Sequence, residues 1–244
     1  MTSPFDSATI GELVAADYRR AGVFDRFGLD YCCGGKRTLE EACRLKGVSR
    51  EAVVLALEAA FPPAPIVPDK SWPLDALADH IVDRHHTYVR DALPLISGHL
   101  EKLVSAHGNR HPELAEIARH FGAVADELRV HMFKEEQMLF PYIRLLCAAA
   151  EHGQPAPPNM FGTVRNPIRM MELEHQNAGD EFAVIRELTN SYAAPEDGCG
   201  TYRATFEELA AFDRDLRLHI HLENNILFPG AAALEAEVMT RVGS

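Results

Sequence analysis

The sequence predicts an all-α protein in which a small N-terminal helical domain is followed by an up-and-down four-helix bundle. Three observations predict this fold. Short helix-start signals come first, and four long segments with helical apolar periodicity come last. Between them, the ten residues from Phe61 to Lys70 hold four prolines, which exclude helix and favour an extended linker. We therefore expect a small domain at 1–61, a linker at 62–71 and the bundle at 72–244.

The small domain is predicted to consist of short helices because it carries their start signals. Thr9-x-x-Glu12 and Thr38-x-x-Glu41 match the capping box, in which the two side chains satisfy N–H groups at the helix start. Ser49 could cap a third helix. A chain of 244 residues with 47% hydrophobic content is long enough to bury a core alongside this domain.

An unusual string, Asp30-Tyr31-Cys32-Cys33-Gly34-Gly35, lies in the small domain. Adjacent cysteines form a disulfide only with strain, so three interpretations stay open: a redox couple, a thiolate donor for a metal, or two unrelated thiols. The glycines permit positive φ and the close approach of another backbone. Cys43, Cys147 and Cys199 are expected to be structural or incidental.

Four long helices are predicted after Lys70, with breaks near Gly108-Asn109, from Gly153 to Pro158 and from Pro195 to Gly200, and a short tail helix from about residue 231. Each long helix carries a stripe at alternating spacings of four and three residues, as the inward face of a bundle does. The only acidic or basic side chains in the stripes are histidines and glutamates. The stripes are Val82, His86, Val89, Leu93, Ile96, Leu100 and Leu103; Ile117, Phe121, Val124, Leu128, His131, Glu135, Met138, Tyr142 and Leu145; Ile168, Met171, His175, Ala178, Phe182 and Ile185; Leu209, Phe212, Leu216, His219, Glu223 and Ile226.

An internal repeat brings metal-ligand chemistry into two of these stripes. His131-x-x-x-Glu135 runs to Leu139-Phe140-Pro141, and His219-x-x-x-Glu223 runs to Leu227-Phe228-Pro229. Positions i and i+4 of a helix share a face, so each copy offers an imidazole and a carboxylate to one point.

The two remaining stripe histidines fall at the same level as the repeat. His86 mirrors His131 about the turn at Gly108-Asn109, and His175 mirrors His219 about Asp197. In two antiparallel hairpins packed in register, all four histidines can therefore meet at one height. The sequence predicts one hairpin used twice, with pseudo-twofold symmetry.

Six side chains are thus expected to converge in an apolar interior: His86, His131, Glu135, His175, His219 and Glu223. Burying unpaired carboxylates there would cost on the order of several kcal/mol each, so a cation should balance them. Two ions bridged by both carboxylates would each take two imidazoles, and a shared oxo or hydroxo group would give five ligands per metal with one position open.

The residue types do not by themselves identify the metal. Imidazole with carboxylate suits iron, zinc or manganese, and spacing alone does not separate them. An open, mixed nitrogen and oxygen site favours iron, since structural zinc sites are usually closed and four-coordinate. A ferritin-like site would need two Glu-x-x-His motifs, and only Glu172-x-x-His175 fits. The histidine-rich set is closer to hemerythrin.

The other eight histidines fall off the stripes or near turns and are expected at the surface. They are His80, His85, His99, His107, His111, His120, His152 and His221. His85 lies on a competing stripe with Leu77 and Ile81, but that stripe runs into His99 and Lys102, so we prefer His86. Glu127, Glu172 and Glu174 could hydrogen-bond the ligands from behind, although solvated helix surface is the favoured interpretation.

Charge and cysteine usage exclude several function classes. A formal net charge of -12 argues against a nucleic-acid partner, because binding phosphates normally needs a basic patch. The N-terminus lacks the features of a signal peptide, and no later segment has the roughly 18 apolar residues that a span needs. The five cysteines are odd in number and, apart from the adjacent Cys32 and Cys33, scattered along the chain. We therefore expect no disulfide framework. We expect a cytoplasmic protein that does not enter a membrane.

The chain resembles a known family, the iron-sulfur cluster repair di-iron proteins, also called the repair-of-iron-centres family. The resemblance covers nearly the whole chain. It is carried by the Pro-rich linker and by four strings: Asp30-Tyr31-Cys32-Cys33-Gly34-Gly35-Lys36, His131-Met-Phe-Lys-Glu135-Glu-Gln-Met-Leu-Phe-Pro141, Met171-Glu-Leu-Glu-His175, and His219-Ile-His-Leu-Glu223-Asn-Asn-Ile-Leu-Phe-Pro229. In this family a small domain with a double cysteine precedes a hemerythrin-like bundle that holds a carboxylate-bridged di-iron centre.

The resemblance implies two iron ions at the six residues above and a cofactor-binding role for Cys32 and Cys33. It also implies a homodimer that restores iron-sulfur clusters damaged by nitric oxide or peroxide, with damaged iron-sulfur proteins as partners and nitric oxide or oxygen species as small ligands. We expect an iron donor more than a classical enzyme. Two alternatives need the same six ligands: a nitric oxide buffer or sensor, and a nitric oxide reductase.

Overall fold

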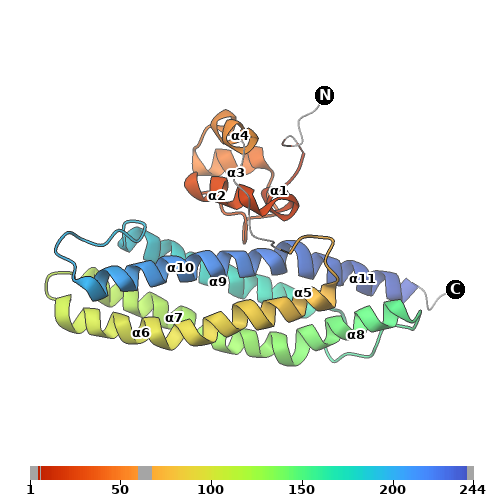
Figure 1. The fold of residues 1–244 in the computed structure, drawn as a ribbon. Helices are drawn as coiled ribbons and strands as arrows, with labels where there is room; N and C mark the ends of the chain where they lie inside the picture. Colours follow the sequence, from red (N-terminus) through yellow and green to blue (C-terminus); the bar gives the residue numbers. More distant parts are fainter. Residues whose placement is uncertain (1–4, 6, 60–67, 241–244) are drawn as a thin grey trace. The chain divides into compact units, whose positions relative to one another are not determined.

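The computed structural model describes residues 5, 7–59 and 68–240, and within these ranges the secondary structure is helical, with one isolated bridge between Thr9 and Thr38 (Figure 1). The all-α prediction is therefore confirmed. Residues 62–67 of the expected linker lie outside the described residues. The chain divides into two compact units, one of Met1–Ala78, Arg144–Pro158 and Leu218–Ser244, the other of Asp79–Ile143 and Asn159–Arg217. The predicted domain boundaries stay a prediction.

Three N-terminal helices begin where the capping residues Thr9, Thr38 and Ser49 predict. They are α1 (Ile10–Ala16), α3 (Leu39–Lys46) and α4 (Arg50–Glu58). The 3-10 turn η1 (Tyr18–Arg20) and α2 (Ala21–Arg26) lie between the first two and carried no predicted cap. Thr9 and Glu12 form both halves of the capping box. The hydroxyl oxygens of Thr38 and Ser49 each accept a backbone N–H from three residues ahead. Such caps stabilise a helix start by about 1 kcal/mol each.

The four long helical segments also appear where they were expected. The first comprises α5 (Leu74–His80), a π-helical segment η2 (Ile81–His86) and α6 (Thr87–His107). The second comprises α7 (Glu113–Lys134), the π segment η3 (Glu135–Leu139) and α8 (Phe140–Glu151). The third is α9 (Arg165–Leu188). The fourth comprises α10 (Gly200–Leu222), the π segment η4 (Glu223–Leu227) and α11 (Phe228–Thr240).

The short tail helix predicted from about residue 231 is present as α11, but it begins at Phe228 and continues directly from η4. In η4 the N–H of Phe228 donates to the carbonyl of Glu223, five residues back. The wider turn already interrupts the regular bonding to the fourth residue back, so Pro229 can follow without ending the helix.

The π segments also shift the buried stripe, which corrects the prediction for the second long helix. Met138 and Leu145 were expected inside, yet they are 41% and 54% exposed, and Leu139 and Leu146 are buried instead. A π turn adds one residue to the helix, so the inward stripe resumes one position later. Before Glu135 the stripe is as predicted, from Ile117 through His131.

The core of the second unit contains an aromatic cluster. Phe121, Phe182 and Phe212 are fully buried, with Phe182 stacked on Phe212 at a ring separation of 5.5 Å and Phe121 edge-on to Phe212 at 5.6 Å. Such pairs add roughly 0.5–1.5 kcal/mol beyond their area burial. Among the described residues, no helix combines the length and apolarity needed to cross a bilayer.

Candidate metal centre

All six predicted ligands are buried, and three of them stand at a π segment. His86 ends η2, while Glu135 and Glu223 begin η3 and η4. The other three, His131, His175 and His219, lie in α7, α9 and α10. None of the six side chains is more than 2% exposed.

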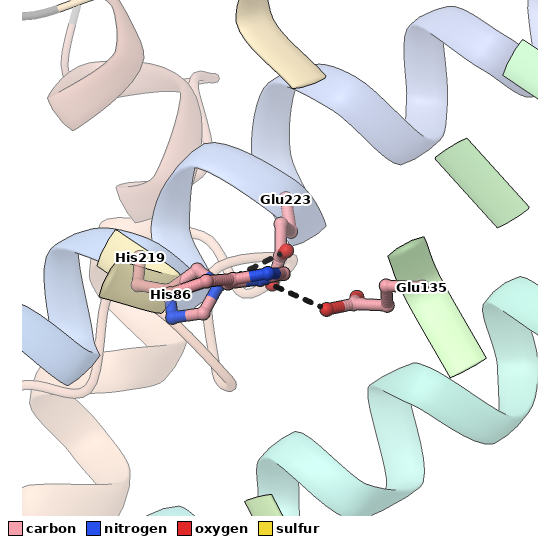
Figure 2. Close-up of side chains that lie close together, drawn as sticks. All are labelled: His86, Glu135, His219 and Glu223. Atoms are coloured by element: carbon pink, nitrogen blue, oxygen red, sulfur yellow. Dashed lines mark hydrogen bonds and ion pairs between the residues drawn. The ribbon is translucent and has the colours of Figure 1, made fainter. Parts of the chain in front are cut away.

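The structure brings these residues together in two groups that could hold a metal ion. His86, Glu135, His219 and Glu223 form the first, which Figure 2 shows. His131, Glu135, His175 and Glu223 form the second. Within each group the ligand atoms all lie within 4.8 Å of one another. Both glutamates belong to both groups, as bridging carboxylates would.

Close contacts between side chains of the set involve the Nε2 atom of each histidine. Glu135 Oε2 lies 3.3 Å from His86 Nε2 and 3.3 Å from His131 Nε2. The Nε2 atoms of His131 and His175 are 3.0 Å apart. His219 Nε2 lies 3.1 Å from Glu223 Oε1, one helical turn along the same segment. The four histidines therefore direct the same ring nitrogen at the carboxylates or at each other.

Two carboxylates behind the ligands set the tautomer of two histidines. Glu136 Oε1 lies 2.6 Å from His86 Nδ1, and Glu174 Oε2 lies 2.8 Å from His131 Nδ1. A carboxylate only accepts hydrogen bonds, so each pair places a proton on Nδ1, and the neutral form of the ring then directs its Nε2 lone pair inward. Burial would raise the pKa of Glu174, but hydrogen bonds from His131 and Lys134 hold it at about 2, so this acceptor is ionised.

This donor set fits a metal cation better than a set of hydrogen bonds. In the neutral ring with the proton on Nδ1, the lone pair of His86 Nε2 faces a carboxylate oxygen at 3.3 Å, and a metal cation between these two atoms would attract both. The same holds for His131. Imidazole nitrogen with carboxylate oxygen suits iron, zinc or manganese.

Sequence reasoning named one of these carboxylates, Glu174, as a possible partner of the ligands but preferred solvated surface for it, and it missed the other. Glu174 was assigned to solvated surface, which is wrong, because it pairs with His131 and Lys134. Glu136 was not considered, although it also pairs with Arg90. A usable signal was present for Glu174, because it directly precedes His175, which was expected at the same height as His131.

The surface assignment of two further histidines is also corrected, since His85 and His221 are each 1% exposed. His85 Nδ1 lies 3.1 Å from Asp215 Oδ2. Burial, with a smaller contribution from the charge of Lys70, lowers the pKa of His221 to about 3, so its ring is neutral. Neither residue belongs to the two metal-binding groups.

The double cysteine forms a third group, with Asp30. Cys32 is buried, Cys33 is half-buried, and their sulfur atoms lie 3.9 Å apart as free thiols. The Asp30 carboxylate accepts the N–H groups of Cys32, Cys33 and Gly34 at 3.1, 3.0 and 2.9 Å, which fixes the turn. The hydrogen bond with Cys33, then burial and the Asp30 charge raise the pKa of Cys32 well above its ordinary value.

Comparison with known proteins agrees with this layout. A domain of unknown function, DUF542, matches residues 6–61, and the hemerythrin HHE cation binding domain matches residues 77–231, which confirms the predicted hemerythrin-like bundle.

Several similar proteins carry the name iron-sulfur cluster repair protein YtfE. The one from Enterobacter sp. (strain 638) is 36% identical over 95% of this chain and 99% of its own length. Those from Musicola paradisiaca and Escherichia coli O8 are 37% and 34% identical, each over 93% of this chain and 97% of their own length.

Proposed function

Because the chain belongs to the family of iron-sulfur cluster repair proteins with a hemerythrin domain, we propose that it repairs clusters damaged by nitrosative or oxidative stress, as a di-iron protein that holds and donates iron. The names of its relatives support the repair role, and their similarity extends over at least 93% of the chain. The observation that carries the proposal is the pair of buried groups that share Glu135 and Glu223.

In this proposal one iron is held by His86 and His219 and the other by His131 and His175, with Glu135 and Glu223 bridging. Bound there, the iron pair would supply redox chemistry and open positions for nitric oxide or an oxygen species. The protein's own part is to keep the Nε2 lone pairs of His86 and His131 aimed inward through Glu136 and Glu174.

Iron is also the cargo, and the double cysteine is its proposed first recipient or the contact for the damaged client. Cys32 and Cys33 lie within ligand distance of each other and of Asp30, which supports a metal-binding role. The raised pKa of Cys32 means that the thiol is protonated at neutral pH until a metal displaces the proton.

The remaining parts of the proposal concern organisation. The matches at residues 6–61 and 77–231 support a domain boundary in the Pro-rich stretch. The family resemblance supports a homodimer, and five free thiols support a reducing compartment such as the cytoplasm.

The first experiment is metal analysis of the iron-reconstituted chain, followed by transfer of isotopically labelled iron to a nitric-oxide-damaged iron-sulfur enzyme. We expect two irons per chain and recovery of client activity together with the label. His131→Ala should abolish both, whereas His152→Ala, which alters an exposed histidine, should change neither. One zinc per chain, or client recovery without the label, would show the proposal to be wrong.

The same reduced protein separates the two alternative uses of the site. Nitrous oxide formed over many turnovers would indicate a reductase. Stoichiometric binding of nitric oxide, with no product and no iron transfer, would indicate a buffer or sensor.

A further inference from the structure

The two asparagines that directly follow Glu223 contact the loop that bears the double cysteine. Asn224 Nδ2 donates to the Cys32 carbonyl at 3.4 Å. Asn225 Nδ2 lies 3.3 Å from the Tyr31 carbonyl and 3.5 Å from the Cys32 carbonyl. Both asparagines belong to the π segment η4, which begins at Glu223. The segment η4 therefore carries a proposed metal ligand, Glu223, and two residues that hydrogen-bond the loop containing Cys32 and Cys33, called the thiol loop below.

Two glycines make room for the Asn225 side chain. A Cβ atom built at Gly11 or at Gly35 would overlap Asn225 Oδ1, and at Gly35 it would also lie 2.5 Å from the Tyr31 carbonyl oxygen. The N–H of Gly11 donates to the Gly35 carbonyl at 2.9 Å, which holds the two glycines together around the amide. The second glycine of the Cys-Cys-Gly-Gly string is thus explained by close approach of Asn225.

A buried histidine completes this contact. Asn225 Nδ2 lies 3.1 Å from His221 Nδ1, and the Tyr31 ring meets the His221 ring edge-on at 5.8 Å. Tyr31 itself is 1% exposed. The thiol loop is consequently held against the end of α10 and the start of η4 by both hydrogen bonds and ring packing.

We propose that Asn225 is a positioning residue that makes the accessibility of Cys32 and Cys33 depend on metal loading. The inference rests on the proposed function, because it takes Glu223 to be a metal ligand. A metal held by Glu223 fixes the first residue of η4, and the N–H of Phe228 ties the end of the turn to the Glu223 carbonyl. Loss of the metal frees the turn, and the loop that rests on its second and third residues loosens with it.

Cys32 reports this loosening, since its side chain is only 4% exposed when the loop is docked. The test is alkylation of the full-length protein by iodoacetamide, with each cysteine followed separately by mass spectrometry, in the iron-loaded and iron-free forms. We expect Cys32 to react about tenfold more slowly in the loaded form, since one or two hydrogen bonds change an opening equilibrium by about that factor.

Asn225→Ala should bring the loaded protein to the rate of the iron-free form without changing its iron content. The matched control is Gln137→Ala, since Gln137 is exposed and holds the corresponding place in the first copy of the repeat. Gly35→Ala disturbs the same contact from the loop side and should act like Asn225→Ala, which covers the case in which one variant misfolds.

The two proposals fail in different ways. If the parent binds no iron, the proposed function fails and this inference with it. If the parent binds two irons but Cys32 reacts equally fast in both forms, or if well-folded Asn225→Ala and Gly35→Ala leave the loaded rate unchanged, only the inference is overturned.

Discussion

The two copies of the repeat share their inner residues and differ in the residues that follow. In both, a histidine precedes the ligand glutamate by four positions, that glutamate begins a five-residue π segment, and Phe-Pro comes next. After Glu135 come Glu136, which contacts His86, and the exposed Gln137. After Glu223 come Asn224 and Asn225, which contact the thiol loop. Each copy of the turn thus offers one buried glutamate to the proposed metal site, and the two residues after the glutamate decide what else the turn contacts.

The π geometry explains how one turn can place a glutamate in the interior and also use the next residues for other contacts. Its extra residue lets the glutamate point inward while the following residues leave the regular stripe, and such bulges are frequent at functional sites. The third long helix carries a proposed ligand, His175, without a π segment, so a place in the candidate site does not by itself require one.

The largest effect is expected from removing one of the two glutamates that begin the π segments of the repeat. Glu135→Ala and Glu223→Ala should each lose both irons, because each carboxylate belongs to both groups. Metal analysis of the two variants side by side measures this. Loss of one iron from one variant only would show that the copies are not equivalent at the metal.

Chelation of the iron should give the next largest effect. At a free iron concentration about a thousandfold above Kd, binding adds about 4 kcal/mol to the free energy of unfolding. For a chain of this size that corresponds to a Tm lower by about 8–16 °C in the iron-free protein. Calorimetry with and without chelator provides the measurement, and an unchanged Tm would contradict metal binding by the folded state.

A milder substitution, Glu135→Gln, should change the Tm of the iron-free protein and the Tm of the iron-loaded protein in opposite directions. In the iron-free protein Glu135 Oε2 faces two imidazole nitrogens. Glu135→Gln replaces that oxygen pair with an amide that can donate, so we expect the iron-free Tm to rise by about 2–4 °C for each kcal/mol of repulsion removed. The iron-loaded Tm should fall. A Tm that falls in both forms would mean that the charge is already balanced without metal.

Substitutions of the residues that directly follow the two glutamates should have different effects on iron binding in the two copies. Glu136→Gln should weaken iron binding by about 10–100-fold, as loss of a partner behind a ligand histidine usually does. Asn224→Ala, at the corresponding position, should loosen the thiol loop and weaken iron binding by no more than about tenfold, the factor by which metal loading is proposed to favour the docked loop. Competition with a chelator of known affinity gives both values, and equal weakening in the two variants would refute the proposed division of labour.

The smallest structural change concerns the thiols. Cys32→Ser/Cys33→Ser protein should keep its iron, because neither cysteine belongs to the two groups formed by the six proposed ligands. A few tenths of a kcal/mol shift the Tm of a chain of this size by about 1 °C, so we expect the Tm to stay within about 1 °C of the parent value. It should nevertheless repair a damaged client several-fold more slowly. If the double variant restored client activity as fast as the parent, the thiols would have no part in transfer.

Helix positions, turns, caps and most of the buried stripes follow from the sequence because they depend on neighbours within one or two turns. The buried stripe through His131 and the capping pair Thr9 and Glu12 are examples. The prediction failed at Met138, where a π residue shifts the stripe. It also failed at His85 and His221, which are buried by residues distant in the chain, Asp215 and Tyr31 among them.

By itself, the sequence determined the all-α class and the six residues that could meet, because helical periodicity and antiparallel register are properties of spacing. Only the tertiary structure decided which carboxylates stand behind His86 and His131 and what the second π turn supports. Those choices depend on how each helix is rotated about its axis, and one extra residue in a turn changes that rotation by roughly 100°. The pairing of Glu174 with His131, and of Asn225 with the thiol loop, belongs to that second kind of information.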